Sequence, residues 1–176
     1  MTATQHPQPR PLSARKLDIL YLVFFVIHIP IMLLIDLGPF IPSAIRPQLS
    51  HTLREYHIQT SKDRFFTDPP AWFTMYMYLE AIYHVPLSAW MTWAIPNDHI
   101  MVPLNLLIFA LETAVTTLTC VVEMGSWDGY TAEQMNGLYA LYLPYLALAA
   151  LIGVDAYTRV RKQILGGGQT IKGKTT

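Results

Sequence analysis

Apolar residues gather in four long runs that are separated by shorter polar stretches. The runs cover roughly residues 17–37, 71–95, 100–123 and 135–157. Each is close to the ~20 residues that a helix needs to cross a bilayer. Because a helix satisfies its own backbone hydrogen bonds in lipid, the pattern predicts an all-α membrane protein whose four transmembrane helices form a bundle.

Composition strengthens this prediction. Hydrophobic residues make up 52% and charged residues 14% of the 176 residues, whereas soluble domains carry about 25% charged residues. We expect an N-terminal tail over residues 1–16, one transmembrane domain over 17–160 and a basic tail over 161–176. The single cysteine, Cys120, lies in the third run and is expected to pack as a small core residue.

Both ends of the chain are basic. The basic residues are Arg10, Arg15 and Lys16 before the first run, and Arg159, Arg161, Lys162, Lys172 and Lys174 after the fourth. Since cytosolic segments carry an excess of Lys and Arg, we expect both termini in the cytosol. The last five residues, KGKTT, resemble a dilysine retrieval signal, which favours the endoplasmic-reticulum membrane. An ordinary basic tail is the alternative.

The longest polar connection covers residues 38–68. Prolines interrupt its first part, and residues 49–59 alternate apolar and polar positions in a way compatible with a short interfacial helix. We expect this segment to cap the lumenal mouth of the bundle. Asp63 has two interpretations: a solvated carboxylate in a turn, which is favoured unless the loop folds inward, or an ion-pair partner that holds the cap in place.

Three carboxylates lie within the apolar runs. At a rise of ~1.5 Å per residue, Glu80 and Glu112 lie near mid-membrane, and Asp36 lies about one to two turns from the lumenal surface. Such acids are costly and therefore functional by default. We expect Glu80 to carry a proton shared with Asp36; a structural bond to neighbouring backbone is the alternative. Glu112 is either functional or a structural acid bonded to nearby threonines.

Proline interrupts three of the predicted helices. Pro30, Pro86 and Pro144 each remove an amide donor and bend their helix, which leaves room between helices. His28 and His84 each precede one of these prolines by two residues. We interpret His28 as a neutral core histidine bonded to freed backbone. His84, one turn from the buried acid of the second run, is a candidate site residue.

One face of the second run combines aromatic, thioether and acidic side chains. Residues at spacings of three and four share this face, namely Phe73, Tyr76, Met77, Glu80 and His84. Walls of this kind fit a rigid, mostly apolar ligand such as a sterol, or an amphiphilic cation that pairs with a carboxylate.

Several segments of the chain resemble the EXPERA family. They are HIPIMLLID at residues 28–36, KD at 62–63, PPAWF at 69–73, YLPY at 142–145, and an acid six residues before Pro86. The likeness extends from about residue 21 to residue 146 and is greatest to the four-helix, sigma-2 receptor branch. It implies an endoplasmic-reticulum bundle with a buried pocket for sterols and cationic amphiphilic drugs.

The resemblance also implies roles for individual residues. Asp36 would pair with a ligand cation, Glu80 would hydrogen-bond to Asp36, and Asp63 would organise the lumenal loop. The expected ligand-binding residues are Asp36, Glu80, His84, Ile31, Tyr76, Met77, Thr117, Tyr142 and Tyr145. The expected structural residues are Asp63, Pro30, Pro86 and Pro144.

Two positions depart from that branch, because His84 stands where it has glutamine and Glu112 where it has an apolar residue. The related emopamil-binding branch contains sterol isomerases, which move a ring double bond by adding one proton and removing another. Glu80, His84 and Glu112 could supply the acid and base. That branch, however, has an additional helix and its own arrangement of histidine and acid in the second helix.

We therefore expect a non-enzymatic membrane receptor of the endoplasmic reticulum that binds sterols and cationic amphiphiles and influences sterol homeostasis through partner membrane proteins. The alternatives are a sterol Δ8–Δ7 isomerase and a structural or chaperone-like membrane partner. We expect no catalytic residue, cofactor, metal ion or nucleic acid in the receptor. The resemblance allows a homodimer.

Overall fold

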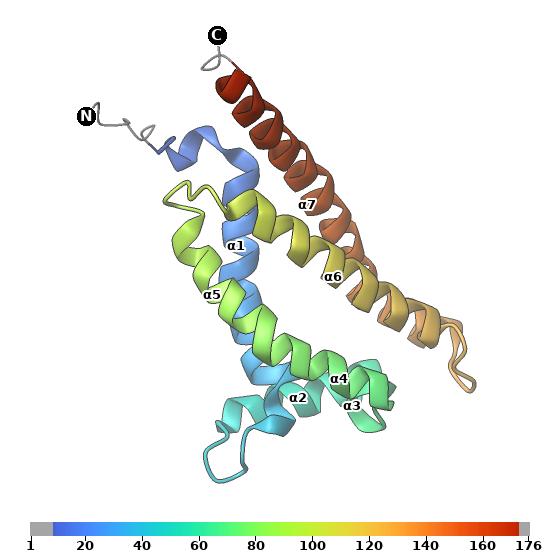
Figure 1. Ribbon diagram of the computed structural model, residues 1–176. Coiled ribbons are helices and arrows are strands. Elements are labelled where there is room, and N and C mark those ends of the chain that lie inside the picture. Colours follow the sequence, from blue (N-terminus) through green and yellow to red (C-terminus); the bar gives the residue numbers. More distant parts are fainter. Residues whose placement is uncertain (1–8, 173–176) are drawn as a thin grey trace.

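The computed structural model describes residues 9–172, with side chains described for residues 9–166. This part of the chain consists of helices and connecting turns (Figure 1). The elements are, in order, η1 (Leu12–Ala14), α1 (Lys16–Ile31), η2 (Met32–Asp36), η3 (Gly38–Phe40), α2 (Gln48–Ser61), α3 (Arg64–Thr67), α4 (Ala71–Leu79), η4 (Glu80–His84), α5 (Val85–Ala94), α6 (Val102–Met124) and α7 (Ala132–Lys172).

Three stretches of helix are long and apolar enough to cross a membrane: Lys16–Asp36, Val102–Met124 and Ala132–Gly166. The second predicted span runs as α4, η4 and α5 and is not among these three. Large apolar side chains point outward, and Ile82 remains 74% exposed. An apolar exterior is suited to lipid, so the prediction of an all-α membrane bundle is confirmed.

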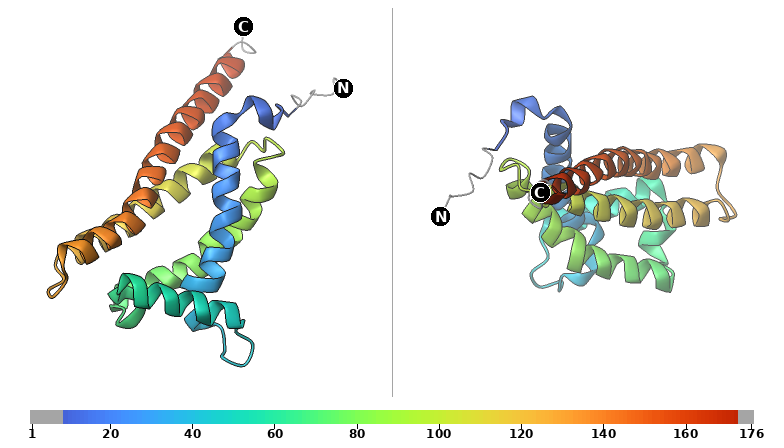
Figure 2. Two further views of the ribbon diagram at one scale, coloured as in Figure 1. Left: turned by 180° about the vertical axis from the view of Figure 1, so that it is seen from behind. Right: turned by 45° about the horizontal axis from the view of Figure 1, so that its top comes forward.

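The helices form two pairs that meet at an angle. Helices α6 and α7 pack along much of their length, and α1 packs against α5. The start of α1 and the end of α7 lie on one side, which we call the terminal end, whereas α2 and α3 lie at the opposite side, the cap end (Figures 1 and 2). The helix predicted within the first loop is therefore confirmed as α2.

The fourth helix is longer than predicted. Helix α7 begins at Ala132, passes through Pro144 and remains helical to Lys172, beyond the expected end at residue 157. A proline inside a helix costs one backbone hydrogen bond, and the rest of this long helix tolerates that loss. The signal-like sequence KGKTT lies outside the described residues from Gly173 onward.

Two apolar clusters hold the bundle together. The larger joins α1, α5, α6 and α7 through residues such as Phe25, Met91 and Leu106. The smaller joins the cap to α6 and α7 around Phe65 and includes Cys120, which is 4% exposed. The prediction that this cysteine packs as a small core residue is confirmed.

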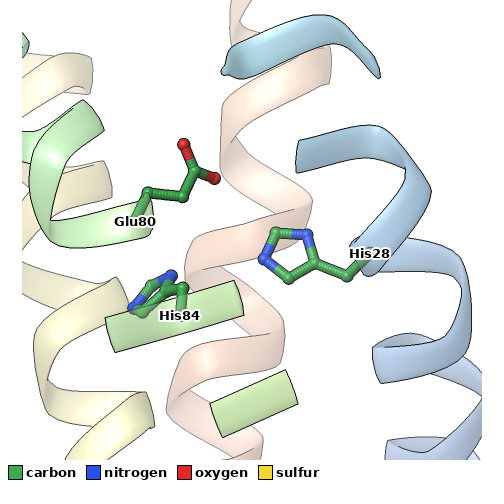
Figure 3. A group of neighbouring side chains, drawn as sticks. All are labelled: His28, Glu80 and His84. Atoms are coloured by element: carbon green, nitrogen blue, oxygen red, sulfur yellow. The ribbon is translucent and has the colours of Figure 1, made fainter. Parts of the chain in front are cut away.

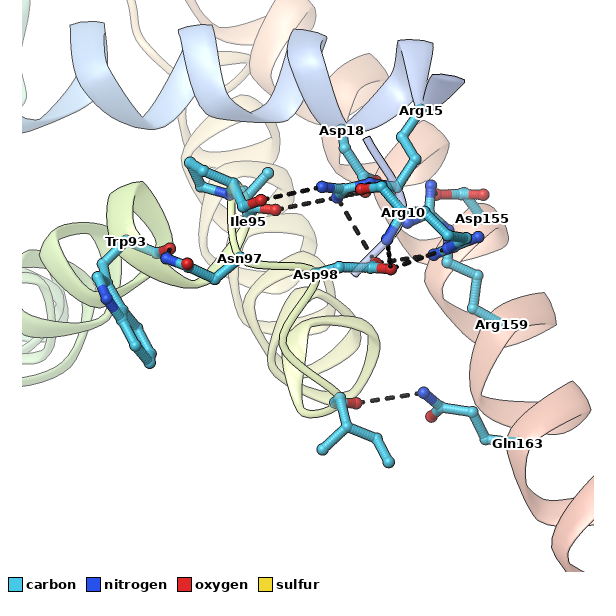
Figure 4. A network of polar contacts seen from close by, with 12 residues as sticks. Arg10, Arg15, Asp18, Trp93, Ile95, Asn97, Asp98, Asp155, Arg159 and Gln163 are labelled. Carbon is cyan, nitrogen blue, oxygen red and sulfur yellow. Dashed lines mark hydrogen bonds and ion pairs between the residues drawn. The ribbon is translucent and has the colours of Figure 1, made fainter. Parts of the chain in front are cut away.

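Charged side chains fasten the helices at the terminal end. This terminal network consists of Arg10, Arg15, Asp18, Asp98, Asp155 and Arg159 (Figure 4). Asp18 receives hydrogen bonds from Arg15 and Arg159, each at 2.5 Å. Arg15 also donates to the carbonyl of Ile95 at 2.9 Å. Because these bonds join α1, the α5–α6 connection and α7, they set the distance between helices that line the interior.

Candidate functional site

A cavity of about 370 Å³ opens within the bundle, between α1, the cap, η4, α6 and α7. This volume lies in the usual range of small-molecule pockets, about 300–1,000 Å³. Every expected ligand-binding residue lines it: Asp36, Glu80, His84, Ile31, Tyr76, Met77, Thr117, Tyr142 and Tyr145. The walls are mainly aromatic and aliphatic, with a few polar side chains directed inward.

Two π-helical turns place the acids on the cavity wall. Asp36 ends η2, and Glu80 begins η4. In η4 the amide of Val85 bonds to the carbonyl of Glu80, which is a five-residue step. Pro86 follows directly and has no amide to donate, so the wider turn accommodates it. Such π-helical turns are frequent at functional sites, since they turn side chains away from the regular helical face.

The predicted pairing of Asp36 with Glu80 is not seen as a direct bond. Both carboxylates line the same cavity, but no hydrogen bond joins them among the described residues. Tyr76, on the same wall, donates to the Thr119 hydroxyl at 3.3 Å. A proton shared between the two acids therefore remains a prediction.

Four polar side chains of the cavity wall lie together, and we call them the deep cluster. They are His28, Glu80, His84 and Glu112. The Nε2 atom of His84 contacts a carboxylate oxygen of Glu112. The rings of His28 and His84 are 6.3 Å apart between centroids, and Phe109 lies 4.7 Å from His84. Helix packing thus brings together residues of α1, η4 and α6 that lie far apart in the sequence.

Two expectations for this region need correction: the threonine bond of Glu112 and the backbone bond of His28. Nearby threonines were the structural alternative for Glu112, but Thr116 donates to its backbone carbonyl at 3.0 Å, and its carboxylate contacts His84 instead. His28 was expected to bond to freed backbone. Its Nδ1 atom has no hydrogen-bond partner in the described part of the chain, and its ring stacks on Phe24 at 4.9 Å instead.

Asp63 lies next to cavity-lining residues at the cap end, and the solvated-turn interpretation was wrong. Its side chain is fully buried. It accepts a hydrogen bond from Tyr142 at 2.7 Å and from the backbone amide of Phe65 at 3.0 Å, which caps α3. His57 lies 3.5 Å away. The loop folds inward, so Asp63 ties the cap to α7.

Arg54 is the basic side chain at this end of the cavity. It donates to the carbonyls of Ile35 and Phe66 at 3.2 and 2.9 Å. Burial lowers the pKa of Arg54 from its ordinary value, while nearby Asp36 acts in the opposite direction. An arginine nevertheless remains charged in proteins. The cavity therefore has a positive group at its cap end.

Sequence reasoning missed Arg54, His57 and His28 as cavity residues. The first two belong to the loop helix, whose inward face cannot be identified before the loop is known to fold over the bundle. The sequence did contain a signal that His28 belongs to the site, because the His-x-Pro pattern around it repeats at His84. Interpreting the two histidines separately hid their proximity.

Comparison with known proteins agrees with this architecture. The model of the EXPERA (EXPanded EBP superfamily) family matches residues 48–156. Sigma intracellular receptor 2 from Xenopus tropicalis is 27% identical over 150 residues, which cover 79% of this chain and 86% of that protein. The human protein of the same name is 23% identical over 155 residues, covering 81% and 88%.

A fungal protein is similar to a comparable degree. Efficient mitochondria targeting-associated protein 19 from Schizosaccharomyces pombe is 26% identical over 157 residues, which cover 86% of this chain and 81% of that protein. The similarity therefore extends across most of the bundle in proteins that carry different names.

Proposed function

Since this chain belongs to the EXPERA family, we propose that it is a membrane receptor that binds a sterol or a cationic amphiphile in its intramembrane cavity. One observation carries the proposal: Asp36 and Glu80 line a single cavity of about 370 Å³ whose other walls are largely apolar. A pocket of this kind buries a rigid apolar body and orients it through a few fixed polar groups.

Each part of the cavity has a role in this proposal. Asp36 pairs with the cation of an amphiphile, and Glu80 supports Asp36 through a shared proton. Tyr76 and Tyr145 present aromatic faces, which attract both cations and flat ring systems. Similarity to proteins named intracellular receptors supports a binding function.

The test is binding of a cationic, ring-containing amphiphile to protein purified in detergent, followed by calorimetry. Asp36→Asn and Glu80→Gln should each weaken binding about 30-fold or more, since loss of a buried charge partner costs ~2–5 kcal/mol. Asp68→Asn is the matched control, because Asp68 is exposed outside the cavity. Unchanged affinity in both folded variants would overturn the assignment of the pocket.

The location of the receptor is part of the proposal. We propose that it resides in the endoplasmic-reticulum membrane with both termini in the cytosol. The start of α1 and the end of α7 lie on the same side of the bundle (Figure 1), and both are basic. Protease protection of tags at both termini tests the topology, and replacement of Lys172 and Lys174 by serine tests retrieval.

A second candidate, a sterol double-bond isomerase, is favoured by the contact between His84 and Glu112. An acid held beside the cavity could protonate one carbon of a ring alkene, which leaves a carbocation on the other carbon. A base beside the same cavity could then remove a proton from the ring carbon next to that cation, which forms the shifted alkene. Incubation of purified protein with a Δ8 sterol in deuterated water decides between the candidates. An isomerase moves the alkene and incorporates deuterium, whereas a receptor returns the sterol unchanged.

A further inference from the structure

We propose that His28, Glu80 and His84 bind a divalent transition-metal ion such as Zn²⁺, and that Glu112 holds His84 in position. The sequence led us to expect no metal site, and these residues come from two separate helical segments, α1 and η4. The proposal goes beyond lipid binding and depends on four observations: geometry, missing partners, charge and support by a neighbouring carboxylate.

Geometry is the first observation. One ligand atom from each of His28, Glu80 and His84 lies within 4.8 Å of the other two. Figure 3 shows the two imidazole rings and the carboxylate directed towards a common space. Tetrahedral Zn²⁺ with bonds of ~2.0–2.2 Å brings its ligand atoms to roughly 3.4 Å from one another. The ligand atoms need to approach one another by up to about 1.4 Å, which the flexible Glu80 side chain and small ring rotations can provide.

Spacing within η4 supports this arrangement. Glu80 and His84 are separated by four residues, so their side chains lie near one another along the helix. The same spacing places two histidines on one face in zinc-binding helices with the His-Glu-x-x-His pattern. Here one ligand of the pair is a carboxylate, and α1 supplies the third ligand through His28.

The second observation is the absence of other partners. His28 and His84 are each only 7% exposed. The Nδ1 atom of His28 has no hydrogen-bond partner among the described residues. A buried polar atom without a partner loses its bonds to water and gains nothing in return. This nitrogen therefore does not fix the ring, and the other nitrogen, Nε2, faces the common space in Figure 3, where an ion would coordinate it.

Charge is the third observation. Glu80 lies close to both histidines, and Glu112 contacts His84. The arginine among the described cavity-lining residues, Arg54, belongs to the cap. Carboxylates deep in a membrane bundle are costly unless a positive group accompanies them. A divalent ion would neutralise two carboxylates at once. Imidazole and carboxylate ligands together suit Zn²⁺ and other late divalent ions.

Support from Glu112 is the fourth observation. Its carboxylate contacts Nε2 of His84, so Nδ1 is the atom of that ring available to the ion. Metal-binding histidines usually donate their other ring nitrogen to a carboxylate, which fixes the orientation of the ring. Glu112 would thus be a positioning residue, whereas His28, Glu80 and His84 touch the ion.

The experiment uses full-length protein purified in detergent, stripped with a chelator and titrated with Co²⁺ and Zn²⁺. We expect one ion per chain, visible absorption bands of Co²⁺ in a site of low coordination number, and competition by Zn²⁺. His28→Ala and His84→Ala should weaken binding at least 100-fold, and Glu112→Gln about 10–100-fold. His51→Ala is the control, because His51 is exposed on α2 and should leave the affinity unchanged.

X-ray absorption of the Zn²⁺-loaded wild-type protein needs no variant and should show two imidazole ligands. The proposal is overturned if the wild-type protein binds no ion after stripping, if His28→Ala binds as tightly as wild type, or if the spectrum shows fewer than two imidazoles. Metal content and spectra are measured without a lipid ligand. Failure here therefore leaves the proposed receptor function standing, and loss of lipid binding leaves the metal site standing.

Discussion

The terminal network and the deep cluster both place ionisable side chains inside an apolar bundle, yet their partners differ. In the terminal network, Asp18 receives bonds from two arginines, and Arg15 also bonds to backbone carbonyls. In the deep cluster, the Nδ1 atom of His28 has no hydrogen-bond partner among the described residues, and the carboxylates of Glu80 and Glu112 line a cavity. Buried groups with complete partners fasten a structure, whereas groups that lack partners beside a cavity are available to a ligand.

The difference shows that burial alone does not identify a functional acid. Asp18 is only 1% exposed and is more buried than Glu80, but Arg15 and Arg159 compensate its negative charge. Glu80 lies on a π-helical turn that opens towards free volume. Four changes test this contrast.

The largest effect is expected from Asp18→Asn. The change removes the carboxylate shared by Arg15 and Arg159 and leaves Arg15 buried with weaker compensation. Breaking a buried ion pair by removing one partner costs ~3–5 kcal/mol. Unfolding by heat or SDS in micelles measures the loss, and Asp128→Asn, at an exposed position, is the control. A cost below about 1 kcal/mol would contradict a fastening role.

A smaller loss is expected from Asp63→Ala, at the cap. The variant loses the cap of α3 and leaves the Tyr142 hydroxyl without its acceptor. We expect a cost of ~2 kcal/mol in the same unfolding measurement. Tyr142→Phe should cost about half as much, because it removes one of the two bonds. If Asp63→Ala were no worse than Asp68→Ala at an exposed position, the cap would not depend on this residue.

Replacing His84 and Glu112 of the deep cluster should leave the stability unchanged or raise it. The double variant His84→Leu with Glu112→Leu exchanges two costly polar groups for apolar ones of similar size. Such exchanges are often neutral or stabilising by ~1 kcal/mol or more. We expect equal or higher stability together with loss of metal binding. Destabilisation as large as that of Asp18→Asn would remove the distinction between the two regions.

The smallest effect concerns pH at the terminal end. A hydrogen bond from Arg10 lowers the pKa of Asp98, in the α5–α6 connection, to about 2. Because the folded-state pKa is lowered, the stabilisation is present above about pH 4 and is lost as pH falls towards about 2. Arg10 is exposed, so the contribution is at most ~1 kcal/mol. Asp98→Asn should remove this part of the pH dependence; an unchanged profile between the two proteins would refute the assignment.

The candidate site was predictable in part. The position of Glu80 in an apolar run and the stripe that it shares with Tyr76 follow from spacing within one helix, and both residues line the cavity. Spacing says nothing about the neighbouring helix. The partner of Glu112 was therefore sought among threonines of its own helix, although it comes from η4.

The sequence by itself determined the apolar runs, the acids that lie within them, and Pro30 and Pro86, beside which the helices change to π-helical turns. These features depend on composition and on local backbone chemistry, which each segment carries with it. Only the tertiary structure decided which side chains meet. The contacts of His28 with His84, of His84 with Glu112 and of Asp63 with Tyr142 join residues far apart in the chain. Helix rotation and the folding of the cap bring them together, and both result from packing of the whole bundle.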